Sequence, residues 1–151
     1  MTAVVIRRAT AGDVPGIVAM LADDEIGAGR ENPADLAPYQ AAFAAIDADP
    51  NQFLVVAERN GELIGTLQLT FVPGLSRQGA TRALVEAVRV ASSARGTGLG
   101  TTLMQWSIEE ARARGCSILQ LTSDKARVDA HRFYHQLGFA QTHEGFKLQL
   151  N

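Results

Sequence analysis

The stretch that decides the fold is Arg95-Gly96-Thr97-Gly98-Leu99-Gly100, between the apolar run Leu84 to Ala91 and a helical pattern that begins at Thr101. This order predicts a strand, a glycine loop and the start of a helix. Glycines at alternate positions let a ligand approach the backbone, and the first amides of a helix have no partners within it. The stretch therefore predicts a site for an anion, most simply a phosphate.

Three narrower interpretations of this loop compete. A dinucleotide loop has the pattern G-x-G-x-x-G, but after Gly96 and Gly98 the third position is Thr101, and the acidic ribose ligand about 20 residues further on is missing. A nucleotide-hydrolysing P-loop has G-x-x-x-x-G-K followed by Ser or Thr, and no lysine follows Gly100. A glycine-rich turn that only joins a strand to a helix stays open on the evidence of the loop alone.

Composition excludes several classes of protein. The 151 residues suffice for one domain with one core, so we expect a single domain covering residues 1–151. A hydrophobic fraction of 46% is ordinary for a soluble protein, and no apolar run approaches the ~20 residues of a membrane span. The net charge of −2 offers no basic field for nucleic acid, and the opening residues show no secretory signal. We therefore expect a cytoplasmic protein that binds neither nucleic acid nor membranes.

Cysteine and histidine give no sign of a disulfide or a metal centre. Cys116 is the only cysteine, and with no evident basic partner beside it we interpret it as a buried structural thiol rather than an acyl-carrying nucleophile. His131 and His135 have i, i+4 spacing, but the sequence identifies no third ligand. We therefore predict that the protein uses no metal.

Turn signals and hydrophobic periodicity predict the other elements. Asn60-Gly61 is a strong hairpin signal between two strand patterns, which makes the sheet antiparallel there. Thr10 followed by Asp13 resembles a capping box at the passage from a strand to a helix. The expected strands are 4–8, 53–58, 63–72, 84–91, 118–122, 139 and 146–150, and helices are expected after residue 13, from 33 to 49, at 101–114 and at 126–137. This order predicts an α/β fold, with a mixed, mostly antiparallel sheet and helices on both faces.

Two motifs in this order resemble the GNAT superfamily of N-acetyltransferases. Arg95 to Gly100 matches its Q/R-x-x-G-x-G/A signature, and Val88-Arg89-Val90 resembles its fourth strand. Ala130 to Phe139 matches its A-x-x-Φ-Y-x-x-x-G-F segment, where Φ is bulky and apolar. The resemblance implies an acetyl-CoA-dependent N-acetyltransferase that moves an acetyl group to the primary amine of a small molecule by direct attack in a ternary complex. An acyl-CoA-binding sensor or interaction module without catalysis is the alternative.

The resemblance also implies a cofactor site. In the family the loop amides and the helix start hold the pyrophosphate of acetyl-CoA, and the pantetheine arm pairs with the backbone of the fourth strand. One amide there, that of Val88 or Arg89, would stabilise a developing oxyanion. Arg127 stands where many members have a cofactor-contacting asparagine, and it would instead meet a CoA phosphate. The residues expected to bind the cofactor are Val88, Arg89, Val90, Arg95, Gly96, Thr97, Gly98, Leu99, Gly100, Thr101 and Arg127.

Two further residues acquire catalytic roles from the resemblance. Tyr134 matches the tyrosine that protonates the departing CoA thiolate, and a phenol with an ordinary pKa of about 10 carries its proton at neutral pH. Glu86 lies where several members keep a carboxylate that helps to deprotonate the amine, often through water. Each has a structural alternative, because Tyr134 could pack beside Phe133 as core, and Glu86 could be an edge charge that interrupts a buried face.

The acceptor is the least defined part of this interpretation. In the family it is bound by the first two helices, their loop and the turn between strands three and four, which here are residues 23–32 and 73–82. We expect a small amine with an acid group, and the resemblance also allows a homodimer. Asp23, Asp24 and Glu25 are interpreted as a solvated helix end rather than an attractor for a cationic amine. Candidate partners for the acid group are Arg30, Arg77 and Arg82, and candidates for an apolar wall are Tyr39, Phe43 and Phe71.

Overall fold

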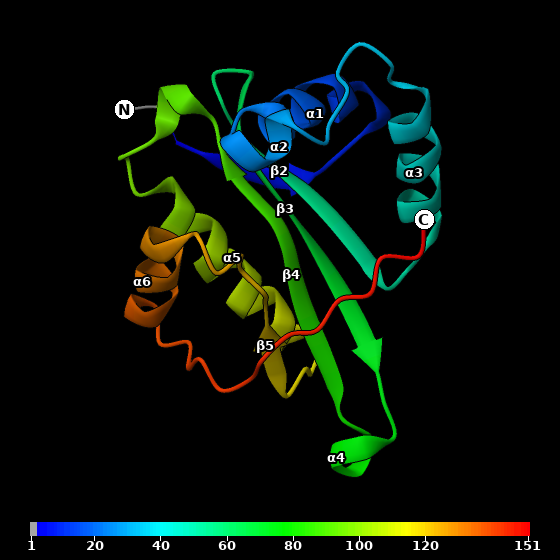
Figure 1. Ribbon diagram of the computed structural model, residues 1–151, viewed down its shortest axis with the longest axis vertical. Helices are drawn as coiled ribbons and strands as arrows, with labels where there is room; N and C mark the ends of the chain where they lie inside the picture. Colours follow the sequence, from blue (N-terminus) through cyan, green and yellow to red (C-terminus); the bar gives the residue numbers. More distant parts are fainter. Residues whose placement is uncertain (1–2) are drawn as a thin grey trace. The chain divides into compact units, whose positions relative to one another are not determined.

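A five-stranded sheet organises the first part of the chain in this computed structural model, which describes residues 3–151 (Figure 1). The chain divides into two compact units, Met1–Gln120 and Leu121–Asn151, and each is described by itself. The strands lie in sequence order, antiparallel from β1 to β4 and parallel between β4 and β5, which confirms the predicted mixed sheet. They are β1 Val5–Arg8, β2 Gln52–Arg59, β3 Glu62–Pro73, β4 Thr81–Val90 and β5 Ile118–Gln120.

The four predicted helices are present with shifted ends, as α1, α3, α5 and α6, whereas the short segments α2 and α4 were not predicted. The helix expected from residue 33 begins instead at Ala37. The side chains of Asn32 and Asp35 accept backbone N–H groups and stabilise turns before Pro38. No helix in the described residues is long and apolar enough to cross a membrane. The helical segments are η1 Ala11–Asp13, α1 Val14–Ala22, α2 Glu25–Ala28, α3 Ala37–Ala48, α4 Ser76–Gly79 at the tip of the β3–β4 hairpin, η2 Ser92–Ala94, α5 Leu99–Ala113 and, in the second unit, α6 Val128–Gln136 (Figure 1).

Helices cover both faces of the sheet, as predicted. On one face, Val56 and Leu54 of β2 pack with Ile17 of α1 and Phe43 of α3. Successive strand residues point to opposite faces, and Phe53 accordingly meets Trp106 of α5 edge-on, with the ring centroids 5.2 Å apart. The face toward α5 forms most of the core, with seven side chains no more than 4% exposed: Val55, Ala57, Leu67, Leu69, Phe71, Ala83 and Val85.

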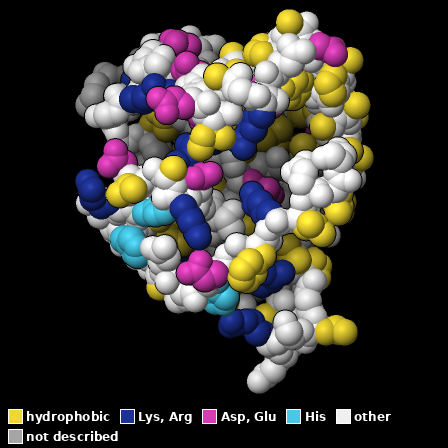
Figure 2. Space-filling model, in the orientation of Figure 1, with side chains coloured by type: hydrophobic (Ala, Val, Ile, Leu, Met, Phe, Trp, Pro, Cys, Tyr) yellow, Lys and Arg dark blue, Asp and Glu magenta, His cyan; other side chains and the backbone are white. Residues whose placement is uncertain are grey.

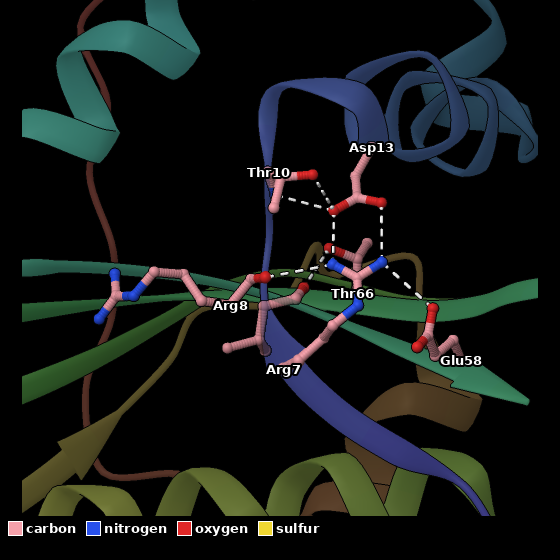
Figure 3. A network of polar contacts seen from close by, with 7 residues as sticks. Arg7, Arg8, Thr10, Asp13, Glu58 and Thr66 are labelled. Carbon is pink, nitrogen blue, oxygen red and sulfur yellow. Dashed lines mark hydrogen bonds and ion pairs between the residues drawn. The ribbon is translucent and has the colours of Figure 1, made fainter. Parts of the chain in front are cut away.

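Arg7 of β1 forms hydrogen bonds with residues of η1 and β2 (Figure 3). Its guanidinium donates to both carboxylate oxygens of Asp13, at 2.7 and 3.0 Å, and to Glu58 Oε2 at 3.1 Å. Asp13 Oδ2 also accepts from the backbone N–H of Thr10 at 2.7 Å, so the predicted capping contact with Asp in place of Glu is confirmed. The network lowers the pKa of Asp13 to about 2, chiefly through the hydrogen bonds from Arg7.

The Asp13 carboxylate should make stability depend on pH. Because its folded pKa lies below its ordinary value of 3.8, its contribution is complete above about pH 4 and is lost as the pH falls toward 2. Asp13→Asn should therefore cost about 2 kcal/mol of unfolding free energy at pH 7, and the difference from wild type should vanish near pH 2. Urea unfolding at several pH values measures both quantities, and a difference that is constant with pH would contradict this assignment.

The end of the chain departs from the predicted pattern. Residues 139–151 form no strand in the described structure, so the strands expected at 139 and 146–150 are wrong. Alternation of Phe146, Leu148 and Leu150 fits a strand, but a strand also needs a neighbour to share its hydrogen bonds, and these side chains are 85–95% exposed. In the first unit, β5 likewise ends at Gln120 rather than Thr122.

Candidate active site

The glycine loop presents open backbone at the start of α5. Gly96 and Gly98 have φ values of +78° and +83°, in the left-handed region that favours glycine. A Cβ at either position would meet nothing within 4 Å. No side chain caps α5, and its first internal hydrogen bond runs from the N–H of Thr102 to Gly98 O. The loop and the first helical turn therefore leave N–H groups available to an anion, and the anion site itself stays a prediction.

The side chains of the loop contribute less than its backbone. Thr97 donates its hydroxyl hydrogen to the carbonyl of Ala94, the last residue of η2. Leu99 is 3% exposed and packs beside Gly65 of β3, where a Cβ would lie 3.2 Å from Leu99 Cδ2. Leu99 therefore anchors α5 to the sheet, and only its backbone can serve a ligand. Thr101 is half-buried, Gly100 lies in the first turn of α5, and Arg95 is exposed.

Among the described residues, strand β4 has an unpaired stretch of edge shortly before this loop. Its parallel pairing with β5 covers only Arg82–Leu84, whereas its pairing with β3 continues to Val90. Within the described residues of the first unit, the backbone of residues 85–90 therefore has no strand partner on the β5 side. An extended ligand can bind such an edge as an added strand, which is the role expected of Val88, Arg89 and Val90.

A β-bulge puts Glu86 and Arg89 on the same face of β4. Residues three apart on a regular strand point to opposite faces, but one extra residue in the strand removes that difference. The irregularity is centred on Ala87, a non-glycine residue with φ of +54°. The register records it, because Gln68 pairs with Glu86 and Thr66 with Arg89, which leaves Leu67 opposite both Ala87 and Val88.

Glu86 lies on a polar part of the sheet. It is exposed, so the concern that it would interrupt a buried face does not apply. Its cross-strand partner Gln68 donates to Gln52 Oε1 at 2.7 Å, and Thr70 donates to the same oxygen at 3.1 Å. The register places all four on the face that carries α1 and α3. Gln52, Gln68 and Thr70 were not predicted as site residues, although the alternation of Gln68 and Thr70 in an apolar strand was a usable signal.

Two ion pairs join the segment between α1 and α2 to the candidate site. Arg89 Nε lies 3.2 Å from Asp24 Oδ2, and these side chains are only 14% and 21% exposed. Arg95 Nη2 lies 3.4 Å from Asp23 Oδ2, with both side chains more than half exposed. The interpretation of this segment as a solvated helix end is therefore wrong for Asp24. Both contacts join residues at least 65 positions apart, so the local pattern could not reveal them.

Tyr134 and Arg127 lie in the second unit. Tyr134 of α6 is half-buried, and its ring centroid is 5.3 Å from that of Phe133 and 5.9 Å from that of Phe139. Its carbonyl accepts from the N–H of Phe139, which closes the end of the helix. Arg127 immediately precedes α6 and is half-buried. The aromatic packing agrees with the structural alternative for Tyr134 and leaves its catalytic role a prediction.

Part of the expected acceptor wall is unavailable. Phe71 is 4% exposed on the α5 face, where the guanidinium carbon of Arg114 lies 4.1 Å from its ring centroid. Phe43 packs against the core between α3 and β2. Arg82 donates to Gln120 Oε1 at 2.8 Å, so this guanidinium already has a partner. The expectation of an aromatic wall is therefore wrong for Phe71, and for the partly buried Phe43 it stays a prediction.

In the part of the chain that the structure describes, neither Cys116 nor a metal site offers competing chemistry. Burial raises the pKa of the Cys116 thiol, which disfavours the thiolate that an acyl-carrying nucleophile needs. Residues 3–151 contain no group of three His, Cys, Asp or Glu side chains that could hold a metal ion. Basic and acidic side chains are interspersed over the described residues on the face drawn in Figure 2. On this face the mixed charges give no large field of one sign.

Comparison with known proteins decides the family. Residues 18–139 match the acetyltransferase (GNAT) family, over most of the chain and across both motifs. The chain belongs to this family. It is therefore an N-acetyltransferase, as its motifs predicted, and the GNAT family uses acetyl-CoA.

Individual GNAT relatives extend the comparison. The chain is 33% identical over 141 residues to an aminoalkylphosphonate N-acetyltransferase of Salmonella typhimurium, a match that covers 93% of this chain and 88% of the relative. It is 31% identical to an L-methionine sulfoximine/L-methionine sulfone acetyltransferase of Pseudomonas paraeruginosa, covering 89% and 78%. The crystal structure of a protein described as a transcriptional regulator from Bacillus halodurans matches with a TM-score of 0.93 and 49% identity, covering 98% and 100%. This likeness confirms the GNAT-like fold.

Proposed function

We propose that this GNAT protein transfers the acetyl group of acetyl-CoA to the primary amine of a small molecule that carries an acidic group. One observation carries the proposal: the open cradle at Gly96 and Gly98 lies at the uncapped start of α5, next to a strand edge that β5 leaves free. The names of two relatives support the substrate class, because an aminoalkylphosphonate and L-methionine sulfoximine are small amines with polar or acidic groups.

The residues present suit the cofactor. Backbone N–H groups from Gly96 to Thr101 would hold the pyrophosphate, where the absence of side-chain atoms lets an anion approach. The backbone of Val88 to Val90 would pair with the pantetheine arm, and the amide of Val88 or Arg89 would face the thioester carbonyl. Arg95 and Arg127 would meet phosphate groups. The bound cofactor supplies an acetyl thioester, whose leaving group is a thiolate.

Two side chains handle the protons in this proposal. Glu86 takes a proton from the ammonium group of the acceptor, directly or through water, so that the free amine can attack the acetyl carbon. Tyr134 gives its phenolic proton to the sulfur as the carbon–sulfur bond breaks. The newly bonded nitrogen then loses its surplus proton, directly or through water, to the phenolate, which leaves the neutral amide and restores Tyr134. Transfer is direct, in a ternary complex, and the raised pKa of Cys116 agrees with a route that has no acyl-enzyme.

A panel of amines tests the reaction and its substrate class. Free thiol released from acetyl-CoA is measured with aminoalkylphosphonates, amino acids, the matching alkylamines that lack an acid group, and polylysine. We expect release with the amines that carry an acid group, with kcat/KM at least about tenfold above that of each matching alkylamine, because an acid group adds charge-assisted hydrogen bonds. Equal rates with and without the acid group would contradict the substrate class.

A second candidate function, an acyl-CoA-binding sensor without catalysis, would require this chain to have lost the acetyltransferase activity of its family. The description of the Bacillus halodurans relative as a transcriptional regulator favours it. The same panel separates the two functions, because a sensor binds acetyl-CoA in calorimetry but releases no thiol with any amine. Amine-dependent thiol release would exclude the sensor.

A further inference from the structure

Asp24 contacts both the α2 turn and strand β4 in the first unit. One carboxylate oxygen, Oδ1, accepts from the N–H of Gly27 and caps α2. The other, Oδ2, lies 3.2 Å from Arg89 Nε on β4. Gly27 is buried so tightly that a Cβ there would lie 1.9 Å from the carbonyl oxygen of Leu21. The α2 turn therefore fixes the position from which Asp24 reaches the strand.

The side chain of Arg89 links Asp24 to the backbone at the β4 bulge. Its Nη1 donates to the carbonyl oxygen of Val88 at 2.9 Å, while its Nε lies within ion-pair distance of the Asp24 carboxylate. The residue before Val88 is Ala87, whose φ of +54° is strained for a side chain other than glycine. A bulge also disrupts the ladder of hydrogen bonds between strands. The guanidinium thus supports the backbone where the ladder with β3 is interrupted.

We propose that Asp24 is a positioning residue for acyl transfer, which acts through Arg89 to hold the β4 bulge so that the Val88 and Arg89 amides keep their direction. The inference rests on the proposed function, in which one of these amides faces the thioester carbonyl. Donors to a developing oxyanion act only when they are held in place beforehand, and the loss of one donor typically slows turnover by about 10²–10³-fold. The role of Asp24 differs from cofactor binding, because its contact on β4 is with the side chain of Arg89, whereas the cofactor is proposed to pair with the backbone of the strand.

The ion pairs of Asp24 and its neighbour Asp23 differ in how far they are buried. Water screens the Asp23–Arg95 pair, which is 3.4 Å long with both side chains more than half exposed. The Asp24–Arg89 pair is shielded on both sides, and loss of the carboxylate leaves a guanidinium with little access to water. The two residues therefore provide a matched test, with the same charge change at adjacent positions.

The test compares Asp24→Asn with Asp23→Asn. Asparagine is also a good N-cap, so Asp24→Asn keeps the α2 turn and removes only the charge. We expect kcat to fall about 10- to 100-fold with the dissociation constant of acetyl-CoA within about threefold of wild type, and Asp23→Asn to keep kcat within about twofold. Amide hydrogen exchange of the cofactor-free protein should be about tenfold faster at Val88 and Arg89 in Asp24→Asn alone.

A double variant tests whether Asp24 acts through Arg89. Arg89→Gln should lower kcat as Asp24→Asn does, and Asp24→Asn should add less than about twofold in that background. Effects that multiply would overturn the inference, as would an unchanged kcat or unchanged amide exchange in Asp24→Asn. Equal losses of kcat, cofactor affinity and unfolding temperature would show a merely structural role and would overturn it too. A wild-type protein that acetylates no amine would instead overturn the proposed function, and this inference with it.

Discussion

Gly98→Trp should reduce acetyl-CoA affinity at least about 100-fold, a loss of about 2.7 kcal/mol of binding free energy. Gly98 has φ of +83° and open space where its Cβ would be, directly before α5. An indole at this position would occupy the cradle in which the pyrophosphate is proposed to bind. Isothermal titration calorimetry with acetyl-CoA measures the change.

The matched control for this change lies at the other end of α5. Gly115 has φ of +74°, and its Cβ would also meet nothing within 4 Å. Gly115→Trp therefore imposes similar backbone strain, roughly 1–2 kcal/mol, without entering the loop. It should lower stability as Gly98→Trp does and leave the affinity for acetyl-CoA unchanged. Equal affinities for the two variants would show that the glycine loop does not hold the cofactor.

Tyr134→Phe should lower kcat by about 100-fold, because removal of a general acid typically costs between about 10² and 10⁴. The ring remains, so its contacts with Phe133 and Phe139 remain too, and acetyl-CoA affinity should hardly change. Rapid-quench single turnovers measure the chemical step without interference from product release. An unaltered single-turnover rate would leave Tyr134 with the structural role that its aromatic packing also fits.

Features that depend on residue type and on near neighbours in the sequence were predictable. Asn60-Gly61 connects β2 and β3 as expected, because both residues adopt the positive φ that a two-residue hairpin turn requires. The open backbone at Gly96 and Gly98 also follows from the residue type, since glycine alone takes these angles without strain. The start of β4 at Thr81 rather than Leu84 is an ordinary boundary shift.

Features that depend on distant partners were not predictable. Nothing in the residues around Ala87 indicates a bulge, because alanine rarely adopts φ of +54° and does so here within the register between β3 and β4. Asp24 looked like part of a solvated acidic turn, and only the folded chain brings Arg89 to it. The apolar alternation at 146–150 predicted a strand, but pairing is a property of neighbours and not of one segment.

One measurement tests the central claim most directly. Acetyl-CoA labelled in its acetyl group is mixed with excess enzyme and an acceptor from the panel, and the reaction is quenched during a single turnover. We predict that the label passes from the cofactor to the amine and that no labelled protein accumulates at any time. Label on the protein, at Cys116 or elsewhere, would contradict direct transfer, and label that stays on the cofactor with every amine would contradict the proposed activity.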